Sequence, residues 1–348
     1  MTHTQVYYYG YYTNYYHACL LACSLQFQLR YCPALAKKPT ATPKPEASDG
    51  HPPPATTTKK PDPFENPSAE LLIAQIPAQN PAYNLVLNKF PVIPDHFILA
   101  TREWKSQTDL LEKGDLEATY ACVKTWAEAE AGAGAGKKLF AFFNSGEESG
   151  ASQPHRHIQF LPVEAMMQQE GEGEERSAWK PLIDVAAEGS KAHPEYRWSD
   201  RLPFAHFALP LPSNPSAETL HAIYLSLYRA AVAAAAAAEG KPHDHDHDPH
   251  QTDGESVISH NLAMTESAMM ICPRRNESAS ISLGKKGAGD DEVAGAGVIA
   301  LNGTILAGTL MVKAEAEWNE LRRNPEVLGS VLAAIGYPAE VVRSVSSL

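Results

Sequence analysis

Apolar residues along this chain fall into short runs that are typical of β-strands and a few longer segments with helical spacing. Strand-like runs lie at residues 71–76, 83–87 and 96–101, and prolines between the last two favour a proline-bounded turn. Residues 115–130 have helical spacing, which predicts an amphipathic helix. Its apolar face consists of Leu116, Tyr120, Val123 and Trp126.

A strand, a polar loop and a returning strand form the most informative stretch. Residues 139–143 are predicted to be a strand, residues 144–154 a loop of small polar residues, and residues 155–162 a second strand. Such a hairpin-like unit would hold its loop at one rim of a sheet, where binding residues often lie.

The second half of the chain mixes strands and helices in the same way. Asn214 is a predicted helix N-cap with Pro215 in the first turn. Strand-like runs follow at residues 260–265, 268–272 and 298–301, and a last helix is predicted from Asn324 to a stop at Gly336. Without strict strand–helix alternation, the pattern predicts an α+β fold with a mainly antiparallel sheet flanked by helices.

Composition divides the chain into four predicted parts. Residues 1–33 are an atypical, tyrosine-rich N-terminal segment, and residues 34–69 are a Pro-rich connector expected to be extended and to supply no core residues. Residues 70–212 and 213–348 are the two folded portions. The second contains alternating His and Asp at 243–250, which we interpret as a disordered polar loop rather than a metal site because flexible ligands lose much entropy on ordering.

Composition also excludes several classes of protein. The 348 residues are 44% hydrophobic and 20% charged, so most of the chain can bury a core. A formal net charge of −12 disfavours binding to nucleic acid, but it does not exclude a small anionic ligand held by local cations. No uninterrupted apolar run reaches the roughly 18 residues of a membrane span, so no membrane partner is expected.

Cysteine usage and the first residues predict a cytoplasmic protein that could also enter the nucleus. The five cysteines are odd in number and scattered, unlike a disulfide framework. Cys19 and Cys23 lack a second pair, so no zinc site is expected there. The first 25 residues have no positively charged start and no cleavage pattern, which does not support a secretory signal.

The candidate chemistry lies in the second strand of the hairpin-like unit. Side chains alternate along a strand, so His155, His157 and Gln159, here called the histidine row, are predicted to project to one side. Two such histidines could ligate a metal, act as general acid or base, or attack phosphorus through a neutral ring nitrogen. No third metal ligand is identifiable, and the preceding loop supplies backbone amides suited to an anion. The nucleophilic interpretation is therefore favoured.

These residues belong to a recognisable pattern. The segment NSGEESGASQPHRHIQFLP resembles the H-x-H-x-Q variant of the histidine-triad superfamily, found in galactose-1-phosphate uridylyltransferases and in fungal ATP adenylyltransferases, also called diadenosine tetraphosphate (Ap4A) phosphorylases. Five flanking motifs resemble the phosphorylases: LAKKP (35–39), DPFENP (62–67), NLVLNKFPVIPDHFIL (84–99), WKPLID (179–184) and HNLAMTESAMMICPR (260–274). The resemblance covers roughly residues 26–338.

The resemblance implies a histidine-triad-like fold, with residues 70–212 as the catalytic domain. It also implies phosphorolysis of Ap4A to ATP and ADP through an adenylylated histidine. By position, His157 matches the nucleophile, Gln159 a contact to the reacting phosphate, and His155 an orienting residue. The other implied substrate-binding residues are Lys37, Lys38, Asn88, Lys89, Asn144, Gly150, Ala151, Ser152, Gln153, Thr265, Met270 and Arg274.

The resemblance also implies the ligands and leaves two other functions open. A divalent cation, typically Mg²⁺, and inorganic phosphate would accompany the dinucleotide, and no metal-ligating residue is identified in the chain. We expect a monomer or a weak homo-oligomer. The alternatives are a nucleotidyltransferase acting on sugar phosphates, as the uridylyltransferases do, and a protein that binds dinucleotides without turnover.

Overall fold

The computed structural model describes residues 7–12, 15–22, 25–37, 62–129, 137–167, 179–188, 196–240, 251–284 and 295–342. For residues 7–12 and 15–19, and for Ala34 and Lys37, it describes the backbone alone. Lys38, the glycine-alanine tract at 131–136, the acidic loop at 171–175 and the His/Asp-rich loop at 243–250 lie outside the described residues.

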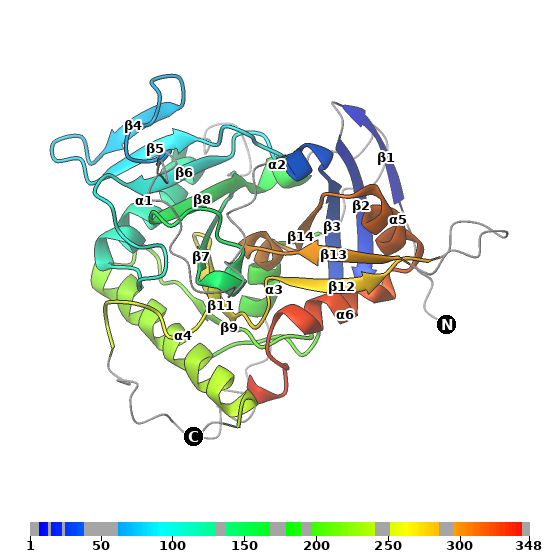
Figure 1. The fold of residues 1–348 in the computed structure, drawn as a ribbon. Coiled ribbons are helices and arrows are strands. Elements are labelled where there is room, and N and C mark those ends of the chain that lie inside the picture. Colours follow the sequence, from blue (N-terminus) through cyan, green and yellow to red (C-terminus); the bar gives the residue numbers. More distant parts are fainter. Residues whose placement is uncertain are drawn as a thin grey trace, which may run out of the picture.

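An eight-stranded sheet forms the centre of the molecule, and each neighbouring pair of its strands is antiparallel (Figure 1). Its strands in spatial order are β4 (Leu72–Ile76), β5 (Tyr83–Leu87), β6 (Phe97–Thr101), β8 (His157–Pro162), β7 (Leu139–Ser145), β10 (His260–Met264), β11 (Ala268–Pro273) and β9 (Phe207–Pro210). The predicted mixed α+β fold with a mainly antiparallel sheet is confirmed.

Two helices cover one face of this sheet. Helices α1 (Lys113–Ala129) and α4 (Ala217–Ala238) pack on each other, and their apolar residues share a core with alternate residues of the strands. Among the described residues α4 is long and apolar enough to cross a membrane, but 56% of its most apolar window is buried in the protein. That burial is what a core helix requires.

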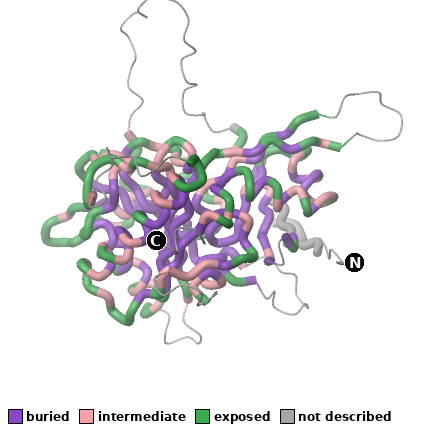
Figure 2. The backbone as a smooth tube through the Cα atoms, turned by 90° about the horizontal axis from the view of Figure 1, so that it is seen from below, coloured by how far each residue is buried: buried purple, intermediate pink, exposed green. Residues whose placement is uncertain are grey.

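The opposite face of the sheet is covered by smaller elements. The helix α3 (Leu182–Glu188) and the 3₁₀ turn η3 (Gly303–Ala307) lie against it, and Figure 2 shows buried backbone concentrated through the middle of the molecule. Around them lie the sheet β1 (Tyr7–Tyr12), β2 (Tyr15–Ala22), β3 (Leu25–Tyr31) and β14 (Thr309–Val312), the hairpin β12 (Ser278–Ser282) and β13 (Ala296–Ala300), α5 (Glu315–Arg323), and α6 (Glu326–Ile335). The short elements η1 (Pro33–Lys37), η2 (Glu147–Ser149) and α2 (Val163–Met167) complete the fold.

The structure corrects the predicted cap of α4 and the predicted lack of core residues in the connector. The helix α4 is capped by Ser216, whose side chain accepts a hydrogen bond from the Thr219 amide, and not by Asn214, whose φ of 53° lies in the left-handed region. The end of the predicted connector does supply core: Phe64 is 6% exposed and packs with Val86, Ile98 and Ala100. The atypical N-terminal segment contributes β3, which pairs in parallel with β14.

Candidate active site

The histidine row lies at the start of β8, in the middle of the large sheet. His157 and Gln159 belong to the strand, and His155 forms an isolated bridge with Ser106 just before it. Phe142 on β7 pairs with Gln159, so Asn144, two residues further along, comes beside His157 on the same face. Gln107, which is 2% exposed, bridges the two strands: its Nε2 donates to the backbone oxygen of Asn144 at 2.7 Å and to that of His157 at 3.2 Å. Its Oε1 accepts from the His157 backbone N–H at 2.8 Å. The backbone of His157 is therefore fixed on both sides.

The ring of His157 is held in one tautomer. Its Nδ1 lies 2.8 Å from the backbone oxygen of His155, and because a carbonyl only accepts, Nδ1 carries the proton. Burial lowers the pKa of His157 to about 4, so the ring is neutral near pH 7. Among the described residues none forms a hydrogen bond to Nε2, which leaves its lone pair available for attack.

His155 is tied down at both ring nitrogens. Nδ1 lies 2.6 Å from the Asp62 carboxylate and Nε2 lies 3.0 Å from the hydroxyl of Thr101. Phe64, two residues after Asp62, stacks over the His157 ring with centroids 4.9 Å apart. The DPFENP segment thus reaches the histidines directly and braces the backbone oxygen that orients His157.

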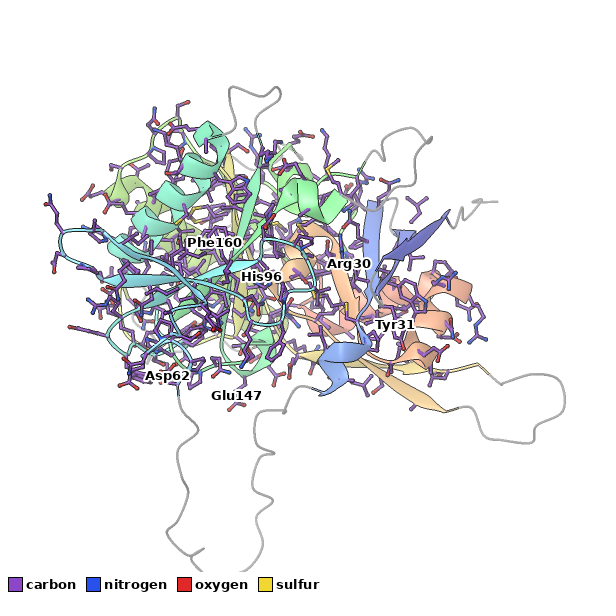
Figure 3. The ribbon with its side chains drawn as sticks, turned by 90° about the horizontal axis from the view of Figure 1, so that it is seen from above. Arg30, Tyr31, Asp62, His96, Glu147 and Phe160 are labelled. Atoms are coloured by element: carbon purple, nitrogen blue, oxygen red, sulfur yellow. The ribbon has the colours of Figure 1, made fainter. Side chains whose placement is uncertain are left out.

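Gln159 is oriented by a second chain of hydrogen bonds. The Nδ1 of His96 accepts from the Asn88 amide at 2.8 Å, so its Nε2 carries the proton and donates to Gln159 Oε1 at 3.1 Å. With its oxygen occupied in this way, Gln159 presents its NH₂ group as a neutral donor. Figure 3 labels His96 and Asp62, which come from different segments of the chain.

The loop before the histidine row is shaped by two glycines with positive φ. Gly146 has φ 89°, and a Cβ added there would lie 2.3 Å from the Ser259 hydroxyl. Gly150 has φ 77°, and a Cβ added there would lie 2.8 Å from the Asn302 side chain. Ala151, Ser152 and Gln153 follow as partly or fully exposed residues leading to β8. Lys89 lies on a separate loop, with Nζ over the Phe90 ring.

The three predicted substrate residues of the second half lie in different surroundings. Arg274, expected to supply a cation, is 2% exposed and donates to the backbone oxygens of Asn276, Glu277, Leu301 and Ile335 and to Asn261. Met270 is 0% exposed and belongs to the core. Thr265 directly follows β10, whose residue Asn261 pairs with Asn144. Four residues of extended chain, roughly 13 Å, separate Thr265 from Asn261. Thr265 lines a cavity of about 390 Å³ with Lys138 and Asp184.

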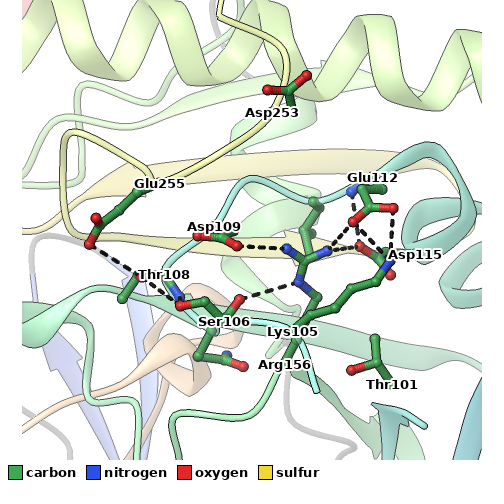
Figure 4. A network of polar contacts seen from close by, with 12 residues as sticks. Thr101, Lys105, Ser106, Thr108, Asp109, Glu112, Asp115, Arg156, Asp253 and Glu255 are labelled. Atoms are coloured by element: carbon green, nitrogen blue, oxygen red, sulfur yellow. Dashed lines mark hydrogen bonds and ion pairs between the residues drawn. The ribbon is translucent and has the colours of Figure 1, made fainter. Parts of the chain in front are cut away.

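An ion-pair network lies on the opposite face of β8 (Figure 4). Arg156, between the two histidines, is 3% exposed and contacts Asp115 at 2.8 Å, Glu112 at 3.0 Å and Asp109 at 3.7 Å. Asp115 lies in the first turn of α1 and also accepts from the Tyr83 hydroxyl at 3.0 Å. This network anchors α1 to the strand that carries the nucleophile candidate.

Four residues of the site were not predicted from the sequence. Asp62 and His96 lie inside the motifs DPFENP and NLVLNKFPVIPDHFIL, whose place in the pattern is the only signal that could have pointed to them. Asn261 likewise lies inside HNLAMTESAMMICPR, whereas Gln107 is a buried amide outside all of these motifs, with no spacing that relates it to the histidines. Among the described residues no group of three His, Cys, Asp or Glu side chains is arranged to hold a metal ion.

Comparison with known proteins places this geometry in a family. The family model described as "Ap4A phosphorylase N-terminal domain" matches residues 16–172, and "ATP adenylyltransferase C-terminal domain" matches residues 200–338. Diadenosine 5',5'''-P1,P4-tetraphosphate phosphorylase 2 of Saccharomyces cerevisiae is 26% identical over 322 residues, covering 90% of this chain and 84% of that protein. Protein APA1 of the same yeast is 27% identical over 324 residues, again covering 90% and 84%.

A solved structure has the same fold. The crystal structure of the yeast Ap4A phosphorylase Apa2 aligns with a TM-score of 0.66 at 24% identity and covers 94% of this chain and 88% of that one. The two family models match complementary parts that together span most of the sequence, in the order that a single phosphorylase would have. The chain therefore belongs to the Ap4A phosphorylase family, also called the ATP adenylyltransferases.

Proposed function

We propose that this protein cleaves Ap4A with inorganic phosphate to give ATP and ADP, and that His157 carries the adenylyl group between two half-reactions. The observation that carries the proposal is the hydrogen bond from His157 Nδ1 to the backbone oxygen of His155, which leaves Nε2 as a neutral nucleophile. One yeast relative matched over most of this chain is named as a diadenosine tetraphosphate phosphorylase, and the yeast Ap4A phosphorylase Apa2 has been solved in complex with Ap4A, which supports the same substrate.

The first half-reaction is a displacement at phosphorus. Nε2 of His157 attacks the α-phosphorus of one adenosine, an N–P bond forms, and the bond to the bridging oxygen breaks. That oxygen keeps the electron pair and leaves with ATP. The attack makes the imidazole formally cationic, and the carbonyl of His155 stabilises that charge through Nδ1–H.

The second half-reaction returns the enzyme to its starting state. An oxygen of inorganic phosphate attacks the same phosphorus, the N–P bond breaks, and ADP leaves while the lone pair returns to Nε2. Gln159 is placed to donate its amide N–H groups to the phosphoryl oxygens in both steps because His96 occupies its oxygen. Gln159 has to donate only hydrogen bonds and no proton, because the acceptor phosphate is already an anion.

Mg²⁺ belongs to the proposal as a substrate-bound ion. The described residues supply no metal site of their own, and Mg²⁺ commonly binds polyphosphates while keeping several waters. No step above depends on it. We also propose that the protein is located in the cytosol or nucleus and that it is monomeric or weakly associating.

Product analysis tests the function. Wild-type protein and His157→Ala would be incubated with Ap4A and phosphate, with and without Mg²⁺, and the nucleotides separated by chromatography. Equal amounts of ATP and ADP from the wild type, and none from a variant whose circular dichroism is unchanged, support the proposal. UDP-glucose with galactose 1-phosphate serves as the competing substrate pair. Turnover of that pair in place of Ap4A, or full turnover by His157→Ala, contradicts the proposal.

A further inference from the structure

The side-chain amide of Asn144 has its two ends in different environments. Its Oδ1 accepts from the Asn261 side chain and from the Gly303 backbone N–H, both at 2.9 Å. Its Nδ2 is buried and has no hydrogen-bond partner among the described residues. Native proteins rarely leave a buried donor unpaired, so this group needs an explanation. It lies beside His157 on the face of the sheet that carries the histidine row.

Asn261, together with the Gly303 backbone N–H, fixes which end of the Asn144 amide is left without a partner. Its Nδ2 donates to Asn144 Oδ1 and, at 2.8 Å, to the backbone oxygen of Ser149 at the start of the glycine loop. Asn261 is 0% exposed, so water does not compete for either contact. If this amide were rotated by half a turn, its oxygen would face two other acceptors, Asn144 Oδ1 and the Ser149 carbonyl.

Arg274 prevents that rotation. A guanidinium has donors and no acceptor, so Asn261 must present its oxygen to Arg274 Nη1. Arg274 itself donates to four backbone oxygens, among them that of Leu301, which lies next to Gly150. In this series the guanidinium donates to Asn261 and Asn261 donates to Asn144. The remaining donor at the end of the series is Asn144 Nδ2.

We propose that Arg274 and Asn261 are positioning residues that make Asn144 present N–H, and not oxygen, to the phosphate attacked by His157. Together the three residues form the amide relay (Arg274, Asn261 and Asn144). This inference rests on the proposed function and deepens it: Arg274 serves the site as a charged residue in the interior that sets a hydrogen-bond direction, and it does not touch the substrate.

Asn261→Asp tests the direction of the relay. The carboxylate keeps the size of the side chain and pairs with Arg274, but it offers only acceptors. It therefore repels Asn144 Oδ1, which keeps a single donor, the Gly303 backbone N–H, and Asn144 no longer holds its N–H firmly toward the phosphate. We expect kcat to fall by about 100-fold, as when one oxyanion donor is lost. We expect Tm to stay within a few degrees of the wild type. The matched control is Asn276→Asp, which adds the same charge at an exposed amide that contacts only the Ala334 carbonyl.

A double-mutant cycle separates positioning from a general structural effect. If Asn261 acts through Asn144, then Asn261→Asp should cost less than about threefold in kcat once Asn144→Ala is present, because the last link is already missing. If kcat of the double variant instead falls by the product of the two separate losses, the relay is refuted. If Asn261→Asp does not fold, Asn261→Ser, which is too short to hold both acceptors, takes its place in the cycle.

A binding measurement distinguishes the relay from the proposed function. AMP affinity, measured by calorimetry, should weaken at least tenfold in Asn261→Asp and stay unchanged in Asn276→Asp. A wild type that binds AMP but never cleaves Ap4A refutes the proposed function, while the affinity difference still tests the relay. A wild type that cleaves Ap4A alongside an Asn261→Asp variant of equal kcat and AMP affinity refutes the relay alone.

Discussion

The surroundings of His157 make it a nucleophile by holding its ring neutral and in one tautomer, and not by making the ring more basic. The proton on Nδ1 is fixed by a backbone carbonyl, the ring is covered by Phe64, and burial keeps the imidazole neutral. The H-x-H-x-Q spacing could reveal this residue because strand alternation alone brings its members to one face. Asp62, His96 and Gln107 could not be found that way, since they come from other segments that only the folded sheet brings together.

The neutral state of His157 predicts the acid side of the pH profile. An ordinary histidine loses its nucleophilic form below its pKa of 6.5, whereas burial lowers that of His157 to about 4. We therefore expect kcat/KM for Ap4A, which reports ionisations of the free enzyme, to show no loss from His157 protonation until the pH approaches 4. Rapid-quench measurements after brief pH jumps would show it. An acid limb centred near 6.5 that shifts when the residues around His157 are changed would contradict this assignment.

Asp62 predicts a difference between two substitutions at one position. Asp62→Ala removes the acceptor that holds His155 Nδ1, so the carbonyl that orients His157 loses its brace and kcat should fall by about 10-fold or more. Asp62→Asn keeps an oxygen at the same place and should retain most of the activity. Steady-state kinetics on both variants decide the matter. Equal losses would mean that the negative charge, and not the hydrogen bond, is what His155 requires.

At the scale of elements, the strand that carries the histidines is held from behind by a helix. Arg156, immediately before this strand, and Asp115 in the first turn of α1 form a buried pair on the side of the sheet opposite to the histidine row. Strands β5, β6, β7, β8, β10 and β11 follow the apolar runs in the sequence closely. By contrast, β1–β3 were missed, because the tyrosine-rich N-terminus carries no clear alternation and is paired by β14 from the other end of the chain.

Breaking the Arg156 pair predicts a loss of stability. Arg156→Met leaves the carboxylate of Asp115, 1% exposed, without its cation, and the free energy of unfolding should fall by about 3 kcal/mol. The control is Lys180→Met, because the side chains of Lys180 and Glu188 are 59% and 67% exposed. That change should alter stability by less than about 0.5 kcal/mol. Urea unfolding of both variants measures the difference, and equal effects would remove the anchoring role given to Arg156.

At the scale of the whole molecule, three buried histidines link stability to pH. Burial lowers the pKa of His157, His206 and His260 to about 4 each, whereas in the unfolded chain each titrates near 6.5. The unfolded state therefore binds more protons between these values. Their contribution to stability is constant above about pH 6.5, falls as the pH drops through this window, and levels off below 4.

The slope of that loss can be measured. Each histidine adds up to about 1.4 kcal/mol per pH unit to the fall in unfolding free energy. Replacing one should lower the slope by its share, and His260→Phe is suitable because His260 Nε2 has no hydrogen-bond partner among the described residues. Urea unfolding at pH 7, 6 and 5 would give the values. A free energy of unfolding that does not change over this range would contradict the burial of the three neutral rings.

In the proposed reaction one ring nitrogen, Nε2 of His157, bonds to the α-phosphorus of Ap4A. The most direct test mixes the protein with Ap4A labelled in both α-phosphates, omits inorganic phosphate, and quenches within milliseconds. We predict one AMP per chain, stable in base and labile in acid, on the peptide that contains His157, with ATP released in equal amount and ADP formed when phosphate is added. Rapid formation of both products with no label on that peptide would contradict the account.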